Sequence, residues 1–452
     1  MRLHLIAVGG SAMHNMAIAL SQKGHTITGS DDAIYEPSRS RLSRYNLLPD
    51  KMGWFEDNIT ENLDAVILGM HARADNPELL KAQKLGLKVY SYPEYIYEQS
   101  KDKIRVVVGG SHGKTTITSM ILHVLKACNK EFDYLVGAQL EGFETMVQIT
   151  DAPIIIIEGD EYLSSPIDRR PKFHLYHANI GIISGIAWDH INVFPTFDNY
   201  KQQFEIFLTT IQPDGIIIYN EDDDIVEEIV KASSSQIIKQ AYSIGEYITE
   251  NGTTSLTVGE KRIPLNVFGN HNLQNLEAAR HACKALGLTD DEFYSSIGSF
   301  KGAAKRLELL GKNSDTTVYK DFAHSPSKLR ATIKAMKEQF PNRELIAVME
   351  LHTFSSLNKD FIEEYKDCMN EADTAVVFIN RRTFEQKGLI PYEENEVKHA
   401  FNNNKLNFFN NSEILVEFLS YINYKSKNLL LMSSGDFGGI DLNVLAEKVL
   451  IQ

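Results

Sequence analysis

The chain has 452 residues, of which 43% are hydrophobic and 23% are charged. This composition is typical of a folded globular protein and excludes an intrinsically disordered chain, and the length predicts about three domains. The formal net charge is −14, so we expect no nucleic-acid partner, because displacing the counterions of a nucleic acid requires a basic surface.

No apolar run approaches the roughly 18 residues that span a bilayer. Polar residues and glycine interrupt residues 1–16 too often for a secretory signal. Three cysteines, Cys128, Cys283 and Cys368, lie far apart and have neither metal-site nor disulfide spacing. These features predict a protein of the reducing cytoplasm, without a membrane partner, and nothing in the sequence indicates an obligate protein partner.

Short apolar runs alternate with helix-like stretches at the start of the chain. Residues 3–8 read as a buried strand that turns at Gly9, Gly10 and Ser11 into a helix. Such alternation predicts a parallel sheet, with ligands beyond the carboxyl ends of the strands. The glycine turn would hold a diphosphate on helix-terminal amides, or it is a plain tight turn. Further strands are predicted at residues 25–29, 65–69 and 88–91.

A second α/β unit begins after the polar residues 99–103 and runs to about residue 300. Its first strand, residues 104–108, leads into a glycine-rich segment that opens a helix, where free amides and the helix dipole favour polyphosphate. Lys114 would bridge the outer phosphates, and the Thr115 hydroxyl would hold Mg²⁺. The alternative is a glycine-rich turn with a surface lysine. The predicted phosphate-binding residues are Gly110, Ser111, His112, Gly113, Lys114, Thr115 and Thr116.

Carboxylates follow the next strong strand, residues 154–157. In a parallel sheet they lie at the same edge as the phosphate loop, and Mg²⁺ prefers one or two carboxylates beside phosphate oxygens and water. We predict that Glu158 is the Mg²⁺ ligand. Asp160 and Glu161 are either supporting carboxylates or solvated loop residues.

His190 follows a third predicted strand, residues 180–186, and would hold a second divalent ion unless it is structural. Residues 299–306 are small and basic, which predicts a hinge. Arg306 would clamp a transferring phosphoryl group there, and a surface arginine is the alternative.

A third α/β unit follows the hinge. Its strands are predicted at residues 317–320, 345–349, 375–379 and 428–432. Clustered amides before it, including Asn272 and Asn275, would read a base edge or cap a helix. Asp321 would hold a ribose hydroxyl or cap a turn.

The motifs converge on one family. They are GGSHGKTT (109–116), EGDE (158–161), WDHIN (188–192), GNHNLQN (269–275), KRLE (305–308) and DFAHSP (321–326), and they occur in the order of the Mur ligase motifs. The chain therefore resembles these ATP-dependent, three-domain ligases of peptidoglycan metabolism. The resemblance implies three α/β domains: a Rossmann-like domain that binds a UDP sugar (1–100), a P-loop ATPase-like domain that binds ATP (101–300) and a Rossmann-like domain that binds the amine (301–452).

Within the family the chain is similar to the branch that acts on UDP-N-acetylmuramic acid. Members that add a tripeptide in peptidoglycan recycling are the closer resemblance, and members that add L-alanine are the alternative. The similarity rests on GSDDAIYEPSRSRL (29–42), EGDEYLSSPIDRRPKF (158–173), GSFKGAAKRLEL (298–309) and MSSGDFGGI (432–440). One departure is ELHTFSSLN (350–358), where an arginine-bearing loop is expected. Another is Glu205, which replaces the carbamylated lysine of some relatives.

The resemblance implies a two-step reaction. The lactyl carboxylate of UDP-N-acetylmuramic acid takes the γ-phosphoryl group of ATP to give an acyl phosphate, which the amino group of L-alanyl-γ-D-glutamyl-meso-diaminopimelate, or of L-alanine, then attacks. The catalytic residues would be Lys114, Glu158, His190 and Arg306. Of two Mg²⁺ ions, one would be held by Thr115 and Glu158 and the other by His190.

The resemblance also distributes the substrates over the chain. Asn272 and Asn275 would bind the adenine, with Asp321, His324 and Arg306 completing the ATP site. The residues expected to contact the UDP sugar and its substituents are Gly9, Gly10, Ser11, Asp31, Arg73, Asn76 and Arg170.

Overall fold

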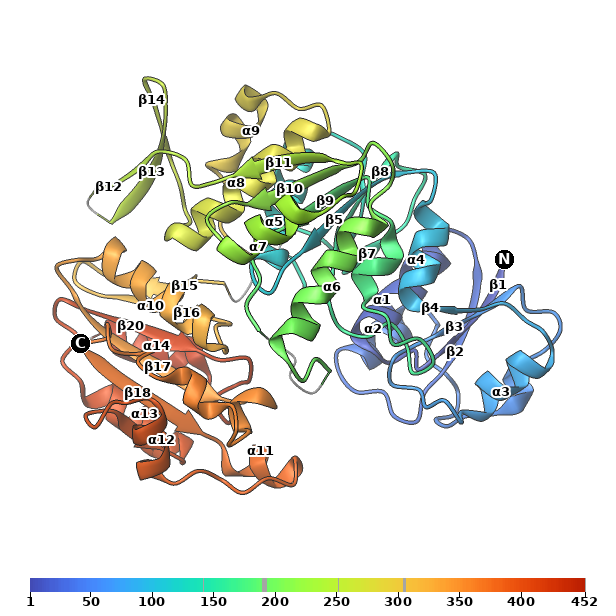
Figure 1. Cartoon of the computed structure of the whole chain (residues 1–452). Helices are drawn as coiled ribbons and strands as arrows, with labels where there is room; N and C mark the ends of the chain where they lie inside the picture. Colours follow the sequence, from blue (N-terminus) through green and yellow to red (C-terminus); the bar gives the residue numbers. More distant parts are fainter. Residues whose placement is uncertain (141, 189–192, 251, 304–305, 452) are drawn as a thin grey trace. The chain divides into compact units, whose positions relative to one another are not determined.

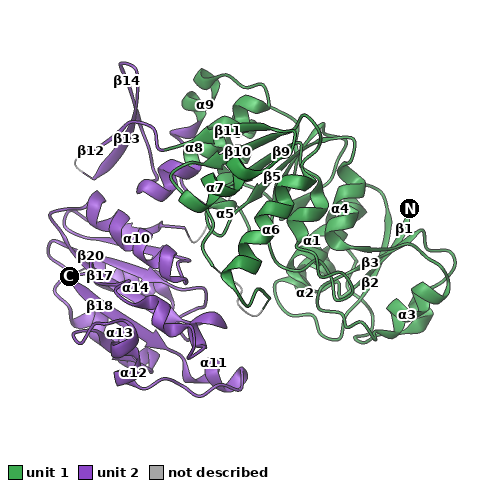
Figure 2. Ribbon diagram, in the orientation of Figure 1, with its two compact units in different colours: residues 1–188, 193–243, 276–296 green, residues 189–192, 244–275, 297–452 purple. Residues whose placement is uncertain are grey.

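The computed structural model describes residues 1–140, 142–188, 193–250, 252–303 and 306–451. The chain forms two compact units (Figure 2). The first contains residues 1–188, 193–243 and 276–296, and the second contains residues 244–275 and the chain from residue 297 onward. Among the described helices, none combines the length and the apolar composition that crossing a lipid bilayer requires.

The first unit begins with a four-stranded parallel sheet. Its elements are β1 (Arg2–Ile6), β2 (Thr26–Ser30), β3 (Ala65–Leu68), β4 (Val89–Ser91), α1 (Ser11–Gln22), α2 (Ser38–Arg44), α3 (Pro77–Lys84) and α4 (Tyr92–Ser100). The strand order is β2-β1-β3-β4 (Figure 1). Leu5 and Ile67 pack with α1 and α4, whereas Ile6 and Leu68 pack with α3. Because both faces are covered, β3 is entirely apolar, and β1 is apolar except for Arg2 and the buried His4.

A seven-stranded sheet follows in the same unit. Its elements are β5 (Ile104–Gly109), β6 (Asp133–Leu135), β7 (Val147–Gln148), β8 (Ile154–Glu158), β9 (Ile180–Ile183), β10 (Ile216–Asn220), β11 (Ile238–Tyr242), α5 (Lys114–Ala127), α6 (Phe197–Thr210), α7 (Asp224–Ala232) and α9 (Asp290–Ile297). The order is β11-β10-β9-β5-β8-β6-β7, and only the β6–β7 pair is antiparallel. The central strand β5 lies between β8 and β9, so the segments that follow these three strands leave the sheet at one edge.

The two sheets of the first unit share one hydrophobic cluster. Helix α4 packs against the 3-10 helix Lys172–Tyr176, and α1 packs against β7. Helix α8 (Asn270–Ala285) begins in the second unit and ends in the first.

The second unit contains a six-stranded sheet and a small antiparallel sheet. The elements are β12 (Tyr247–Glu250), β13 (Thr253–Val258), β14 (Lys261–Pro264), β15 (Glu308–Lys312), β16 (Thr317–Asp321), β17 (Glu344–Leu351), β18 (Thr374–Ile379), β19 (Asn407–Phe409), β20 (Lys427–Met432), α10 (Pro326–Gln339), α11 (Arg381–Gln386), α12 (Glu394–Ala400), α13 (Ser412–Tyr421) and α14 (Leu442–Leu450). The larger sheet has the order β15-β16-β20-β17-β18-β19 and is parallel except at β15 (Figure 1). Helices α10 and α12 cover one face, and α13 and α14 cover the other. The predicted α/β class is confirmed.

Candidate functional site

A glycine loop joins β5 to α5. Gly110 has a φ of +131°, and a Cβ placed on it would lie 2.2 Å from Ser184 Oγ. Gly113 has a φ of +80° and directly precedes the first residue of α5. Both positions need glycine, one for space and both for backbone conformation. The loop therefore brings backbone amides to a helix N-terminus, a favourable place for phosphate.

Lys114 is held at the start of α5 by two acceptors. Its Nζ donates to the Gly110 carbonyl at 2.5 Å and to Glu161 Oε2 at 2.7 Å. Glu161 is 1% exposed. Burial is the largest single influence and lowers the pKa of Lys114, but the charge and hydrogen bond of Glu161, with the charges of Asp160 and Glu158, together outweigh it, and the net shift of the pKa is upward. An ammonium has three N–H donors, and two of them have acceptors among the described residues, so the third can serve a phosphate oxygen.

Tyr200 on α6 connects this ion pair to the loop. Its hydroxyl donates to Glu161 Oε1 at 3.2 Å and lies 2.9 Å from Ser111 Oγ, which accepts from the Ala187 amide at 2.8 Å. The sequence analysis left Glu161 open and missed Tyr200. No sequence motif near Tyr200 indicates its contact with the loop, because Tyr200 and the loop are about 90 residues apart in the chain and meet only in the folded protein.

Glu158, the last residue of β8, lies beside the same loop. Thr115 Oγ1 donates to Glu158 Oε1 at 2.7 Å, and the Gly137 amide donates to Glu158 Oε2 at 2.7 Å. A hydroxyl and a carboxylate are hard oxygen donors, the kind that Mg²⁺ prefers, so the pair fits this ion. The predicted second metal ligand, His190, lies outside the described residues.

Asp160 has a different partner from Glu158. Its carboxylate accepts from Lys172 Nζ at 2.5 Å and from the Tyr162 amide at 3.0 Å. Burial alone raises the pKa of Asp160, but Lys172 outweighs it and the pKa is lowered. Asp160 thus orders its own loop, while Glu158 and Glu161 lie at the phosphate loop.

Two of the residues predicted to bind the sugar nucleotide, Asp31 and Asn76, make hydrogen bonds to the backbone around the first sheet. Asp31 Oδ2 accepts from the Gly9 amide at 2.7 Å, so it fixes the glycine turn from the end of β2. Asn76 is buried and caps α3, accepting from the Glu78 and Leu79 amides. Its amide oxygen therefore has a structural role, which the sequence analysis did not separate from ligand binding.

Two predicted arginines lie on the surface with acidic neighbours. Arg73 pairs with Asp75 at 3.1 Å, and Arg170 pairs with Asp168 at 2.6 Å. Arg170 also lies 3.5 Å from Glu94 of α4. Arg170 is 59% exposed, and its guanidinium is accessible to an anionic ligand.

A polar contact that the sequence did not reveal links the first sheet to the second. Arg41 donates to Asn15 Oδ1 at 3.2 Å and to Gln139 Oε1 at 2.6 Å. The Met146 amide donates to the same Asn15 oxygen at 2.9 Å, and the Asn15 amide donates to the Ser11 carbonyl at 2.8 Å. The glycine turn at Ser11 is thereby tied to the segment that precedes β8.

In the second unit, the structure brings the predicted hinge and third-domain residues together. The Arg306 guanidinium lies 4.7 Å from the centre of the Phe322 ring. Asp321 accepts from the Leu307 amide at 2.7 Å and from the Ala323 amide at 2.7 Å, and His324 Nδ1 lies 2.7 Å from the Phe322 carbonyl. Asp321 therefore fixes the backbone beside Arg306.

The amides at the start of α8 are also buried. Asn272 donates to the Phe268 carbonyl at 2.9 Å, and Asn275 is 6% exposed. The sequence analysis missed His271. Its pKa is lowered, mainly by burial; the charge of Asp321 raises the pKa and the charge of Arg306 lowers it. Asn272, His271 and Arg306 thus belong to one region of the second unit.

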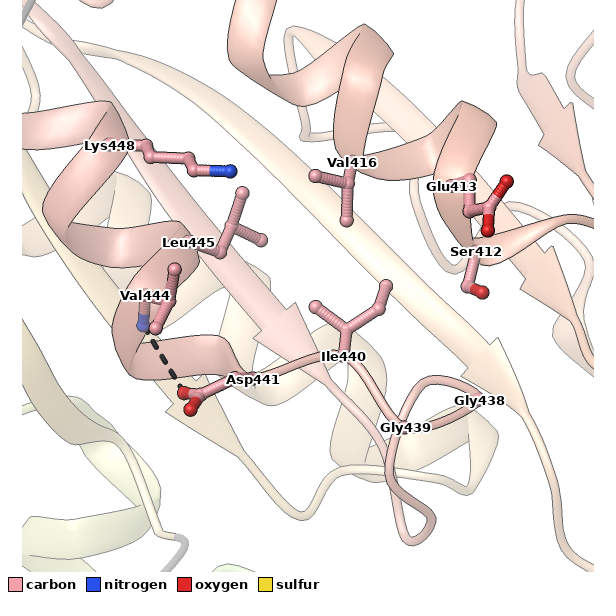
Figure 3. A pocket seen from close by; sticks show the side chains of 10 residues that line it. All are labelled: Ser412, Glu413, Val416, Gly438, Gly439, Ile440, Asp441, Val444, Leu445 and Lys448. Carbon is pink, nitrogen blue, oxygen red and sulfur yellow. Dashed lines mark hydrogen bonds between the residues drawn. The ribbon is translucent and has the colours of Figure 1, made fainter.

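A separate hollow of about 370 Å³ opens between α13 and α14. Val416, Ile440 and Val444 line it with apolar surface, and Lys448 lies along one side (Figure 3). Asp441 caps α14 by accepting from the Val444 amide at 3.2 Å. Part of the lining of this hollow, from Gly438 to Asp441, directly follows residues 433–437 in the chain.

Comparison with known proteins agrees with this architecture. The Mur ligase family catalytic domain matches residues 2–103, the Mur ligase middle domain residues 108–283, and the Mur ligase glutamate ligase domain residues 305–435. The UDP-N-acetylmuramate–L-alanine ligase of Caldicellulosiruptor saccharolyticus is 32% identical over 83% of each chain.

Two other relatives are similar over nearly the whole length. The UDP-N-acetylmuramate–L-alanyl-γ-D-glutamyl-meso-2,6-diaminoheptandioate ligase of Haemophilus influenzae is 27% identical over 98% of each chain. The crystal structure of a murein peptide ligase from Psychrobacter arcticus shares the fold, with 21% identity, a TM-score of 0.67 and 99% of each chain covered. The chain therefore belongs to the Mur ligase family, the ATP-dependent amide ligases of peptidoglycan synthesis.

Proposed function

We propose that this ligase joins the lactyl carboxylate of UDP-N-acetylmuramic acid to the amino group of L-alanyl-γ-D-glutamyl-meso-diaminopimelate in peptidoglycan recycling. The observation that supports a peptide acceptor is a contact in the second unit between residues 350–358 and residues 432–440, the second of which carries part of the resemblance to tripeptide-adding members. Ser433 Oγ and the Phe437 amide both donate to Glu350 Oε2. The 350–358 and 433–439 segments thus lie beside each other in the second unit.

In this proposal, each of three regions of the chain binds a different substrate. Residues 1–100 bind the UDP sugar through Gly9, Gly10, Ser11 and Asp31, with Arg73, Asn76 and Arg170 as further contacts. Residues 101–300 bind ATP through the loop from Gly110 to Thr116. Residues 301–452 bind the amine, and Asp321, His324 and Arg306 complete the nucleotide site together with Asn272 and Asn275.

The chemistry requires cations, because a carboxylate approaching a triphosphate meets like charge. Lys114 and Arg306 are the side chains that neutralise the transferring phosphoryl group. Two Mg²⁺ ions belong to the proposal, one on Thr115 and Glu158 and one on His190, and they supply further neutralisation of phosphate charge. Tyr200 and Glu161 hold the loop and Lys114 in place before the phosphates are bound.

An L-alanine-adding ligase is the second candidate, favoured by the 32% identity to the enzyme of that name from Caldicellulosiruptor saccharolyticus. The two candidates share the nucleotide and sugar sites and differ only in the amine.

Phosphate release with ATP, Mg²⁺ and UDP-N-acetylmuramic acid separates the two candidates. We expect turnover with L-alanyl-γ-D-glutamyl-meso-diaminopimelate and little with L-alanine, and mass spectrometry should show the UDP-N-acetylmuramoyl tripeptide. Turnover with L-alanine alone would instead establish the second candidate. A reaction without UDP-N-acetylmuramic acid serves as the blank for uncoupled ATP hydrolysis.

Glu161→Gln is expected to lower kcat/KM for ATP by about ten- to one-hundred-fold, because a hydrogen bond between two charged groups is worth roughly 1.5–3 kcal/mol. The carbonyl oxygen of the glutamine can accept from Tyr200 or from Lys114 but not from both, and the amide no longer offsets the charge of the ammonium. Steady-state kinetics with ATP as the varied substrate measures the effect. Glu205→Gln, on an exposed site of the helix that carries Tyr200, is the matched control. Equal losses in both variants would argue against a role for Glu161 at Lys114.

A further inference from the structure

Four buried polar atoms of the second unit have no hydrogen-bond partner among the described residues: the Tyr424 hydroxyl and, from two adjacent strand ends, Glu350 Oε1, His352 Nδ1 and Ser434 Oγ. Glu350 is 0% exposed. Most buried polar groups in proteins are paired, because leaving one unpaired costs free energy. Three such atoms at the ends of two adjacent strands indicate that a ligand, and not another part of the protein, is their hydrogen-bond partner.

The three atoms come from the ends of two adjacent parallel strands. Glu350 is on β17, His352 follows that strand, and Ser434 follows β20, which pairs with β17. The carboxyl ends of parallel strands are where open α/β sheets bind ligands. Glu350 Oε1 lies 3.8 Å from His352 Nδ1.

The loop after β20 fixes this carboxylate in one orientation. Its Oε2 accepts from the Ser433 hydroxyl and the Phe437 amide, so only Oε1 remains for a ligand. A Cβ on Gly435 would lie 2.5 Å from His352 Nδ1 and 2.8 Å from Glu350 Oε2, so only glycine lets the loop approach so closely. The site is therefore built and held rigid.

The chemistry of the three atoms defines the ligand. A carboxylate oxygen and a hydroxyl oxygen accept hydrogen bonds, as an imidazole nitrogen does where it carries no proton, and a primary ammonium has three N–H donors. Burial raises the pKa of the Glu350 carboxyl, and a neighbouring cation offsets that cost. The nearby Lys387 uses one of its donors on the His352 carbonyl, at 2.6 Å from Nζ.

Building on the proposed function, we propose that Glu350, His352 and Ser434 bind a primary ammonium group of the amine substrate, and that this is not the group that reacts. A buried carboxylate stabilises the protonated amine, whereas the nucleophile must lose its proton before it attacks. The bound ammonium is then a second amino group. A peptide that ends in a diamino acid has one, and L-alanine does not.

The test compares two peptides on the wild-type enzyme, so it does not depend on the folding of a variant. One is L-alanyl-γ-D-glutamyl-meso-diaminopimelate, and the other is the same peptide acetylated on the side-chain amino group of its third residue. We expect acetylation to raise KM for the peptide about ten- to one-hundred-fold, with a smaller change in kcat. Equal KM values for the two peptides would overturn the inference and leave the proposed function standing.

Glu350→Gln locates the effect. The amide oxygen still accepts from Ser433 and Phe437, while the charge is lost, so this variant should bind the two peptides with nearly equal KM. Glu447→Gln, on the exposed side of α14, should discriminate like the wild type. A Glu350→Gln enzyme that keeps the full preference for the free amino group would overturn the assignment to Glu350. Turnover with L-alanine and with neither peptide would overturn the inference together with the proposed function.

Discussion

Lys114→Ala is expected to abolish ligation while largely sparing the binding of UDP-N-acetylmuramic acid. The ammonium lies at the helix N-terminus between the Gly110 carbonyl and Glu161, and these two acceptors from the described part of the chain leave its third N–H for phosphate. Its loss removes a fixed positive charge from the transferring phosphoryl group, and such a loss costs about 10³-fold or more in kcat. Phosphate release measures turnover, and isothermal calorimetry measures binding of the sugar nucleotide.

The ion pair demands a stability control in the same experiment. Removing Lys114 leaves Glu161 buried without its cation, which costs about 3–5 kcal/mol when a buried pair is broken on one side. The double variant Lys114→Ala/Glu161→Gln removes both charges, so it should recover much of the lost melting temperature and none of the activity. Lys130→Ala, an exposed lysine beyond the end of the same helix, should behave as wild type. Wild-type turnover by Lys114→Ala would mean that the loop is not the ATP site.

The sequence predicted β5 and the glycine-rich turn into the following helix, because both signals are local. Residues 104–108 are apolar except for Arg105, and β5 extends this run by one residue to Gly109. Two strand predictions were too long at their carboxyl ends. The first strand stops at Ile6, where Ala7 turns with a φ of +65°, and β9 stops at Ile183, where the Ser184 hydroxyl donates to the carbonyls of the phosphate loop.

Contacts between segments that are distant in the chain could not be predicted from the sequence. Arg41 meets Gln139 almost 100 residues away, and Tyr200 meets Glu161 across 39 residues. Neither residue belongs to a pattern with a fixed spacing. The pairing of Glu350 with the 433–437 segment has the same origin, because only the order of strands in the sheet places β17 beside β20.

The small antiparallel sheet β12–β14 was missed for a different reason. Its strands are four to six residues long and only partly apolar, such as TTSLTV in β13. Short strands of this composition resemble loops in sequence, and pairing with neighbours rather than local preference makes them strands. Asn76 shows a related limit, because a polar residue before a helix looks the same whether it caps the helix or binds a ligand.

Glu158→Gln is expected to lower turnover by about 10²–10³-fold and to raise the Mg²⁺ concentration needed for half-maximal rate. The amide can still accept from Thr115 or Gly137, so the loop should keep its structure, while the negative charge that attracts the hard cation is lost. Titration of Mg²⁺ in the phosphate-release assay measures the shift, and an unchanged melting temperature would show that the fold is intact.

Asp160→Asn is the matched control for this variant, because Asp160 lies two residues away and pairs with Lys172 at 2.5 Å. Its Mg²⁺ requirement should stay close to that of the wild type. If Asp160→Asn shifts the Mg²⁺ titration and Glu158→Gln does not, the metal carboxylate has been assigned to the wrong residue. If the Mg²⁺ titration shifts in Glu158→Gln alone, the hydrogen bond from Thr115 to Glu158 also has an explanation. It holds the two oxygens that would bind the ion next to each other before the metal is present.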